Sequence, residues 1–384
     1  MFFSLREGFH PMNETIQEFN AYIEAPTYDP TVSQLAQTGI KRYQTLSSLQ
    51  NARRAEGVGA GRTPNWIQDT FDQSEDEMIT SLSQIPGPPT WTVASIDSAY
   101  QYWQKKNPPS SLDTTLPTLT MVKGVSVNFL HEVPLAKNSI LQLASQFNFL
   151  ESPNNQITPV SAYLYDSTQG PQGSIEAGAA ALHRTAAVRA QKLHHALTML
   201  LPANHQSYYQ NGYLELFKIP DDQLSGVFNY VKQRVSKMRV LAQWVQCEAS
   251  GRVQLQVFSA APSYQGVSMP QDDSIGAQFC RFVVGTQYEV IGKLAVIRSL
   301  IAQQNVPVHL TLVGQGAFNN PPSVLKVALK RLADVIKGCP RVYVYLHAYN
   351  EAGQQKVRGV VDPSAFLFRE MTREEFGCMS LPIS

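Results

Sequence analysis

Residues 141–189 read LQLASQFNFLESPNNQITPVSAYLYDSTQGPQGSIEAGAAALHRTAAVR, in which an apolar strand runs into a polar loop and then a small-residue helix. Its first residues are apolar enough for a buried strand. The strand is predicted to end at Ser145, Gln146 and Asn148, with Glu151 directly after them. Open α/β sheets bind ligands outside the carboxyl ends of their strands. The pattern therefore predicts a binding site at this strand end.

A polar loop and a helix of small residues follow. Asp166 lies just before the glycines and proline of QGPQG, residues 169–173, and a helix is predicted to begin near Ser174. Alanines and Gly178 occupy its first turns. Such small residues let a ligand or another backbone approach closely.

From Thr118 onward, apolar strands alternate with amphipathic helices. Strands are predicted at 121–133, 139–147, 213–217, 252–262, 308–314 and 341–349, the first two adjacent to each other. Helices are predicted at 175–201, with a break near its end as an alternative, and at 222–245, 275–304 and 322–338. This alternation predicts a three-layer α/β/α fold with a mixed sheet.

Residues 1–115 have a different character and are predicted to form a helical N-terminal subdomain. Apolar stripes at helical spacing indicate helices around 32–49, 72–83 and 96–106. Trp66, Trp91 and Trp103 need burial, so this subdomain should pack on the domain formed by residues 116–384.

The composition excludes some partners. With 31 basic and 30 acidic residues, the chain has no basic excess that would indicate nucleic-acid binding. It has no run of about 18 apolar residues, so no membrane span is expected. The four cysteines are too widely spaced for a metal box or a disulfide framework. We expect neither a metal nor a cofactor.

A second glycine loop follows another buried strand. After VHLTLV, the residues GQGAFNNPP, 314–322, lead into a helix that starts near Pro322. Backbone amides at such glycines can surround an anion, and the geometry suits a diphosphate. The loop lacks the acidic residue of a Rossmann motif and the Lys-Ser/Thr of a P-loop. The alternative is an ordinary strand-to-helix turn.

These segments together resemble a divergent branch of the macrodomain proteins. ASQFNFLE (144–151) and YDSTQGP (165–171) match its ASQFN-x-LE and D-x-TQGP motifs, and a small-residue helix follows. VQLQVFSAAPSY (253–264) and HLTLVGQGAFNNP (309–321) then match its next strand and second glycine loop, in the same order. The resemblance covers about residues 120–350. Members of this branch include Legionella effectors that remove ADP-ribose from protein arginines.

The resemblance implies a set of ligand-binding residues. Asn148 would lie against the distal ribose of ADP-ribose, with an ordinary strand-end cap as the alternative. The loop around that ribose would be formed by Thr168, Gln169, Gly170 and Pro171. The diphosphate and proximal ribose would be held by Gly314, Gln315, Gly316, Ala317, Phe318 and Asn319.

The resemblance also implies a catalytic carboxylate. Asp166 matches the aspartate of the branch and could stabilise positive charge on the ribose or activate water. Glu176 departs from the pattern, where a small residue is expected; it would assist Asp166 or favour the helix N-terminus. Glu151 is the third candidate, or it fixes the loop. A structural aspartate bonded to loop amides remains the alternative for Asp166.

The function implied is a hydrolase that removes mono-ADP-ribose from modified proteins, and the choice of arginine rests on the resemblance alone. The alternative is a non-catalytic module that only binds ADP-ribose. The C-terminal residues 371–384, MTREEFGCMSLPIS, are similar to the tail signals of type IV secreted effectors. We therefore expect action inside a host cell on a modified host protein; a solvated final turn is the alternative for this tail.

Overall fold

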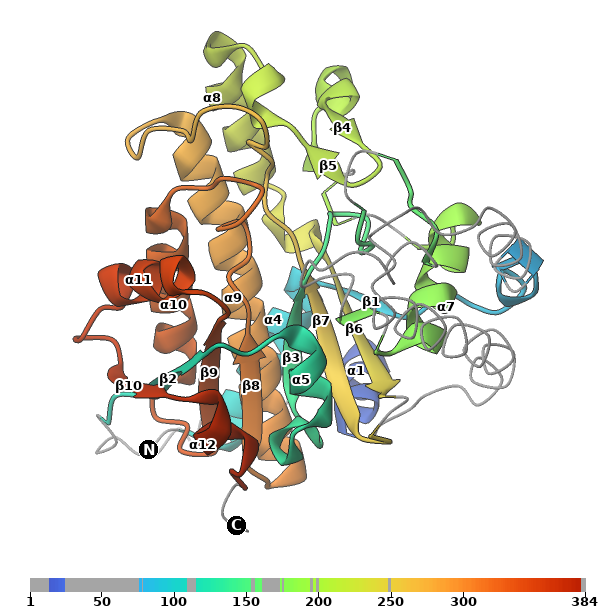
Figure 1. Ribbon diagram of the computed structural model, residues 1–384. Helices are drawn as coiled ribbons and strands as arrows, with labels where there is room; N and C mark the ends of the chain where they lie inside the picture. Colours follow the sequence, from blue (N-terminus) through green and yellow to red (C-terminus); the bar gives the residue numbers. More distant parts are fainter. Residues whose placement is uncertain are drawn as a thin grey trace, which may run out of the picture.

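The chain folds around one eight-stranded mixed sheet flanked by helices, which confirms the predicted α/β class. The computed structural model describes residues 14–24, 76–77, 79–108, 115–152, 156–160, 173–174, 176–193, 196–197, 200–247 and 250–380. The sheet contains β1 (Thr90–Thr92), β2 (Thr118–Lys123), β3 (Ile140–Ala144), β6 (Arg239–Gln246), β7 (Val253–Ser259), β8 (Val306–Leu310), β9 (Val342–Ala348) and β10 (Leu367–Met371). Their order across the sheet is β1-β6-β7-β3-β8-β9-β2-β10 (Figure 1).

Six strands that are neighbours in the sheet, β7, β3, β8, β9, β2 and β10, run parallel to one another. At the β7 edge, β6 pairs antiparallel with β7, and β1 pairs antiparallel with β6. Strands β6 and β7, which come after β3 in the chain, lie on one side of β3 in the sheet. Strands β8 and β9, which come next in the chain, lie on the other side of β3. The strand order therefore reverses next to β3. In open α/β sheets the carboxyl ends of the strands at such a switch point form a crevice that binds ligands.

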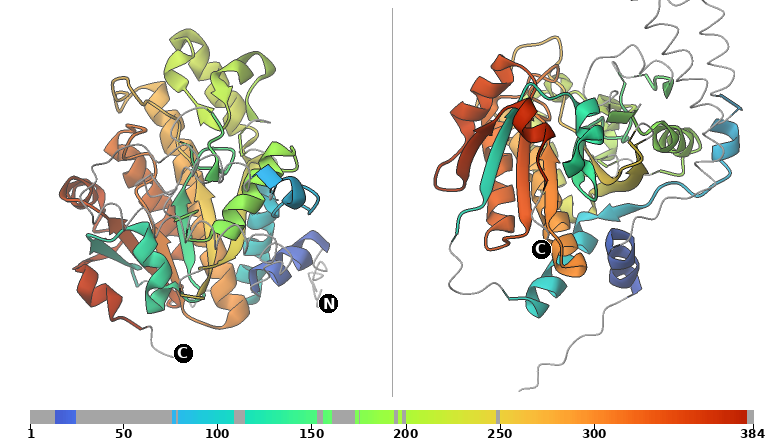
Figure 2. Two further views of the ribbon diagram at one scale, coloured as in Figure 1. Left: turned by 45° about the vertical axis from the view of Figure 1, so that its right-hand side comes forward. Right: turned by 60° about the horizontal axis from the view of Figure 1, so that its bottom comes forward.

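Helices cover both faces of the sheet. The helices are α1 (Glu14–Glu24), α4 (Val93–Lys106), α5 (Val127–Glu132), α7 (Gly178–Arg189), α8 (Asp221–Lys232), α9 (Ile275–Ala302), α10 (Pro322–Ile336), α11 (Glu351–Val360) and α12 (Arg373–Gly377). One face carries α9, which packs against α4 and α10. The opposite face carries α5, α7 and α12, with α7 near the β6 end of the sheet (Figures 1 and 2). Helix α11 contacts α10, β9 and β2.

Helix α9 is the long central helix of the core, and its sequence explains its length. The hydroxyl of Ser274 accepts a hydrogen bond from the amide of Ala277 and caps the amino end. Most of its residues are buried, because it packs against the sheet and against helices α1, α4, α8 and α10. Gln303, with φ of 52°, ends it in the left-handed region. Within the described ranges, no helix has both the length and the apolar character that crossing a membrane requires.

Residues of the predicted N-terminal zone contribute to the same sheet and core. Strand β1 pairs antiparallel with β6. The helix predicted at 96–106 is observed as α4, which begins three residues earlier and packs on α9. Helix α1 packs on α4 and α9. The ring of Trp91 lies edge-on to Phe19 at 5.0 Å, and the indole of Trp103 donates to Asn20. Trp66 lies outside the described residues.

The predicted helix 222–245 is wrong in its second half. Helix α8 ends at Lys232, a short 3-10 turn follows, and β6 begins at Arg239. Strand β6 is buried on both faces and lacks the polar alternation of a half-exposed strand. A continuous apolar run is therefore indistinguishable from a buried helix by periodicity alone.

The predicted strand 121–133 is also too long. It stops at Lys123, since Gly124 takes a φ of 71°, and residues 127–132 form α5. The two strands predicted as adjacent are separated in the sheet by β8 and β9. The strand predicted at 213–217 is shorter: Tyr213–Leu214 form β5, which pairs with β4 (Tyr209–Gln210) in a small hairpin. The helix predicted at 175–201 is regular only as α7.

Candidate functional site

A cavity of about 540 Å³ lies at the carboxyl ends of the parallel strands, beside the switch point. Four successive strand-end loops contribute to it, those after β3, β7, β8 and β9. It is lined by Ala144, Ser145, Gln146, Glu151, Ser152, Tyr213, Ala261, Gln265, Leu312, Val313, Gly314, Gln315, Gly316, Ala317, Phe318, Tyr349, Asn350, Ala352, Gly353 and Lys356. The volume falls within the range of small-molecule sites.

The loop after β8, which we call the glycine loop (residues 314–318), offers backbone groups to the cavity. Gly314 has φ of 77°, and a Cβ there would lie 2.8 Å from the Cβ of Ala261. The turn is closed by hydrogen bonds from the amide of Gln315 to Leu312 and from the amide of Asn320 to Gly314. Within the described part of the chain, the amides of the three residues 316–318 donate no hydrogen bond.

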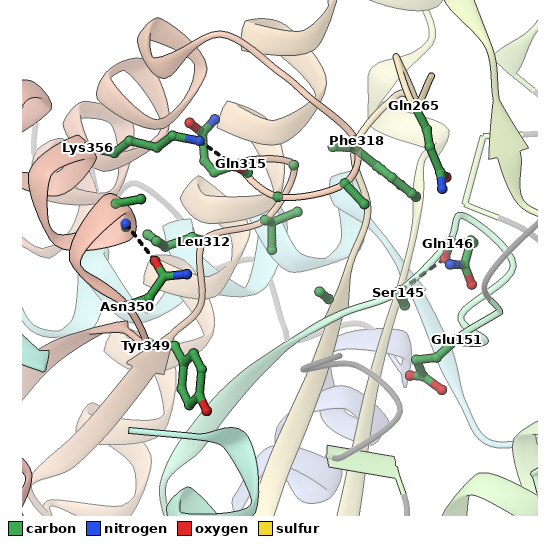
Figure 3. Close-up of a pocket in the computed structure, with 18 of the residues that line it drawn as sticks. Ser145, Gln146, Glu151, Gln265, Leu312, Gln315, Phe318, Tyr349, Asn350 and Lys356 are labelled. Atoms are coloured by element: carbon green, nitrogen blue, oxygen red, sulfur yellow. Dashed lines mark hydrogen bonds between the residues drawn. The ribbon is translucent and has the colours of Figure 1, made fainter. Parts of the chain in front are cut away.

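The loop after β9 leads into α11, and this helix adds positive charge to the same side of the cavity. Asn350 caps α11, since its side chain accepts from the amide of Gly353, so the amino end of a ten-residue helix forms part of the wall. Lys356 on this helix donates from Nζ to the carbonyl of Gln315 at 2.6 Å (Figure 3). A helix amino end, a lysine and uncommitted amides together favour an anion here.

The loop after β3, which we call the β3 loop (residues 145–152), has its own backbone groups paired. The side chain of Gln146 bonds both the amide and the carbonyl of Ser152, at 2.8 and 2.9 Å. The hairpin between β4 and β5 supports this loop from outside, because the amide of Phe147 donates to Gly212 and the hydroxyl of Tyr213 donates to Ser152. This loop therefore presents side chains to the cavity.

Glu151 is the acidic side chain of the β3 loop. It is 1% exposed, and its Oε2 lies 3.4 Å from Nη2 of Arg184, which is 0% exposed. Burial raises the pKa of Glu151 to about 7, and the charge of Arg184 and a hydrogen bond from Ser174 act in the opposite direction. A carboxyl group with such a pKa can exchange a proton near neutral pH.

The cavity is electrically asymmetric. Among the lining residues that the structure describes, Lys356 is the one basic side chain and Glu151 the one acidic side chain. Figure 3 shows Lys356 and Asn350 on one side and Glu151 on the other, with Phe318 between them. The geometry suits a ligand with an anionic group at one end and a developing positive charge at the other.

The structure brings together only part of the predicted site. Glu151 and residues Gly314, Gln315, Gly316, Ala317 and Phe318 line the cavity. Asn319 lies beside it, where its side chain donates to the carbonyl of Val267 at 3.0 Å. Asp166, Thr168, Gln169, Gly170 and Pro171 lie outside the described residues.

Asn148 and Glu176 are not among the lining residues. Asn148 is fully buried in the β3 loop, where Nδ2 donates to Asn211 and Oδ1 accepts from the amide of Leu150. Glu176 lies near Cys247, whose Sγ is 3.9 Å from its Oε2, beyond the end of β6. Burial and the negative charge of Glu132 raise the pKa of Glu176 to about 7.

Sequence reasoning missed several lining residues. Tyr349 and Asn350 directly follow β9. The rule that ligands bind at strand ends was applied to the strand 308–314; applied to β9 as well, it would have found these two residues. Tyr213 and Gln265 come from loops distant in sequence, and no local pattern marks them. Within the described ranges, no cluster of three or more His, Cys, Asp or Glu side chains could hold a metal ion.

Comparison with known proteins gives little. No family model matches the chain, and no curated protein matches it in sequence. A structure of a Trypanosoma brucei macrodomain in complex with ADP-ribose is similar over 73% of this chain and 95% of that one, at 10% identity and a TM-score of 0.31.

Proposed function

We propose that the cavity binds ADP-ribose and that the protein hydrolyses mono-ADP-ribose from modified protein side chains. The observation that supports this most is the asymmetry of the cavity. The uncommitted amides of residues 316–318, the amino end of α11 and Lys356 suit a diphosphate, and Glu151 lies on the other side. Arginine as the modified residue, and the setting of a secreted effector acting on a host protein, rest on the sequence resemblance.

In this proposal Glu151 acts as the general base. The oxygen of a water molecule forms a bond to the anomeric carbon of the distal ribose while the bond from that carbon to the arginine nitrogen breaks. The electron pair of the broken bond stays on the nitrogen. The carboxylate takes a proton from the water, and the nitrogen receives a proton in turn, so the products are ADP-ribose and unmodified arginine. Asp166 is the second candidate for this role.

A module that binds ADP-ribose without hydrolysing it is the alternative function. One observation favours it: the carboxyl of Glu151 is almost fully buried and already paired with Arg184, as a structural carboxylate would be. Release of ADP-ribose from an arginine-modified protein distinguishes the two functions, because only the hydrolase produces it.

The binding step is tested by calorimetry with free ADP-ribose on the parent and on Gly316→Val. A Cβ at Gly316 meets no atom within 4 Å, so the valine fits the fold but occupies space at the cavity wall. Binding should be lost. Gly226→Val is the matched control, because Gly226 on α8 is equally unobstructed and does not line the cavity. Equal affinity in the parent and Gly316→Val, with both folded, would refute the assignment of the glycine loop.

A further inference from the structure

Arg184 is a charged residue that is fully buried in the middle of α7. Its side chain is fully buried in a helix made largely of alanine and other small residues. Removing a guanidinium from water is costly unless its donors are paired. The partners of its donors should therefore show why a positive charge is held at this position.

Among the described residues, the guanidinium bonds Ser174, Gln243 and Phe149 as well as Glu151. Nη2 donates to the hydroxyl of Ser174 at 2.7 Å, Nη1 to the side-chain oxygen of Gln243 at 3.3 Å, and Nε to the carbonyl of Phe149 at 3.3 Å. Its Cζ lies 4.1 Å from the ring centroid of Phe258. Strands β6 and β7, the segment before α7 and the β3 loop thus fix its position, with Glu151 as one contact among several.

The contact to the β3 loop holds backbone as well as side chain. Phe149 has φ of 67°, a conformation that non-glycine residues rarely adopt. Arg184 bonds the carbonyl of this residue and, two residues later, the carboxyl of Glu151. One guanidinium therefore sets both the course of the loop and the direction of its acidic side chain.

We propose that Arg184 is a positioning residue for the proposed hydrolase, which holds the Glu151 carboxyl at the cavity wall and keeps it ionised for work as a general base. This inference rests on the proposed function. Arg184 does not line the cavity and acts only through Glu151.

The electrostatic balance around Glu151 supports the proposal. Burial favours the protonated carboxyl, which cannot accept a proton from water. Among the described residues, Arg184 on α7 is the charged group that acts against burial. The neutral groups that do so are the hydroxyl of Ser174, from the segment before α7, and the backbone amide of Glu151 itself. Removing the positive charge should therefore raise the pKa of Glu151 further, beyond its value of about 7.

The experiment measures hydrolysis of an ADP-ribosylated protein against pH for the parent, Arg184→Gln and Arg184→Lys. In the parent, turnover should rise as pH passes 7, because a general base works when deprotonated. In Arg184→Gln this rise should move up by about 1–3 pH units. Arg184→Lys keeps the charge but not the planar set of donors, so its midpoint should stay near that of the parent while kcat falls at least ~10-fold and KM changes little.

Arg298→Gln is the control for loss of a buried arginine. Arg298 on α9 is 3% exposed, lies over Trp244 and bonds backbone carbonyls far from the cavity. This variant should lose stability without a shift in the pH profile. If Arg184→Gln does not fold, Arg184→Lys still tests the proposal. An unchanged kcat in Arg184→Lys, or an unchanged midpoint in a folded Arg184→Gln, would overturn it.

A separate measurement distinguishes this inference from the proposed function. The difference in unfolding free energy between the parent and Glu151→Gln, followed from pH 4 to 9, reports the pKa of Glu151 without any activity. The same difference, measured in the Arg184→Lys and Arg184→Gln backgrounds, reports how strongly the charge of Arg184 lowers the pKa of Glu151. If the parent has no hydrolase activity but the coupling is present, the proposed function fails; if activity is present and the coupling absent, the role of Arg184 fails.

Discussion

The glycine loop and the β3 loop face the same cavity, but they are built in opposite ways. In the glycine loop three residues, Gly314, Gly316 and Ala317, have little or no side chain, and the amides of residues 316–318 are left available, with Lys356 bonding the loop from α11. In the β3 loop the backbone groups are paired through Gln146 and the β4–β5 hairpin, and a buried side chain, Glu151, is presented. The glycine loop should therefore lose ligand binding when atoms are added to it. The β3 loop should lose its function when the carboxyl group of Glu151 is removed.

The largest effect is expected for Glu151→Gln. The amide keeps the size of the side chain but cannot accept a proton, so turnover should fall by roughly 10² to 10⁴. Affinity for free ADP-ribose should change little, because most of its contacts are expected on the glycine loop. Asp166→Asn, measured in parallel, tests the second candidate. Turnover of Glu151→Gln within about threefold of the parent would remove Glu151 as the base.

The pH dependence of stability follows from the raised pKa of Glu151. Its folded-state value of about 7 exceeds the ordinary value of 4.5, so the native state binds more protons between these limits. This contribution to stability is complete below pH 4.5 and is lost as pH rises through 7. The parent should therefore lose on the order of 1–3 kcal/mol relative to Glu151→Gln between pH 5 and 8. Denaturant unfolding at several pH values measures it; a pH-independent difference would contradict the buried, protonatable carboxyl.

Gly212→Ala tests the support of the β3 loop. Gly212 has φ of 95°, and a Cβ there would lie 2.6 Å from Cγ of Asn148 and 2.7 Å from Cβ of Gln146. We expect a loss of roughly 1–3 kcal/mol in unfolding free energy, and reduced turnover because the β3 loop is displaced. Thermal unfolding and the hydrolysis assay are the measurements, and full stability in this variant would show that the hairpin does not constrain the loop.

Gly316→Ala should have a much smaller effect on stability. The position has no left-handed φ and no neighbour within 4 Å of the added Cβ, so stability should be unchanged or rise by about 0.4–1 kcal/mol. Affinity for ADP-ribose should nevertheless fall. Calorimetry and denaturant unfolding on the same preparation separate the two effects, and a clear loss of stability would mean that the loop is packed more tightly than its geometry indicates.

Removal of metal should have no effect. The proposed step uses a carboxylate and water, so hydrolysis in EDTA should equal that in magnesium. Complete loss of activity in EDTA, restored by magnesium, would replace this mechanism by metal-assisted hydrolysis.

Local periodicity, proline and glycine encode several features that can be predicted without the structure. These are the α/β class, the strands 252–262, 308–314 and 341–349, the helices at 275–304 and 322–338, and the glycine loop. It failed where burial hides the pattern, as in β6, which is buried on both faces. Folding of the whole chain is needed to place Glu151 at the cavity and Glu176 near Cys247, and to bring Tyr213 and Lys356 to the site. These features depend on contacts between segments far apart in the sequence, and such contacts form only when the sheet assembles. The same assembly buries Glu151, which raises its pKa, and places Arg184 beside it, which acts in the opposite direction.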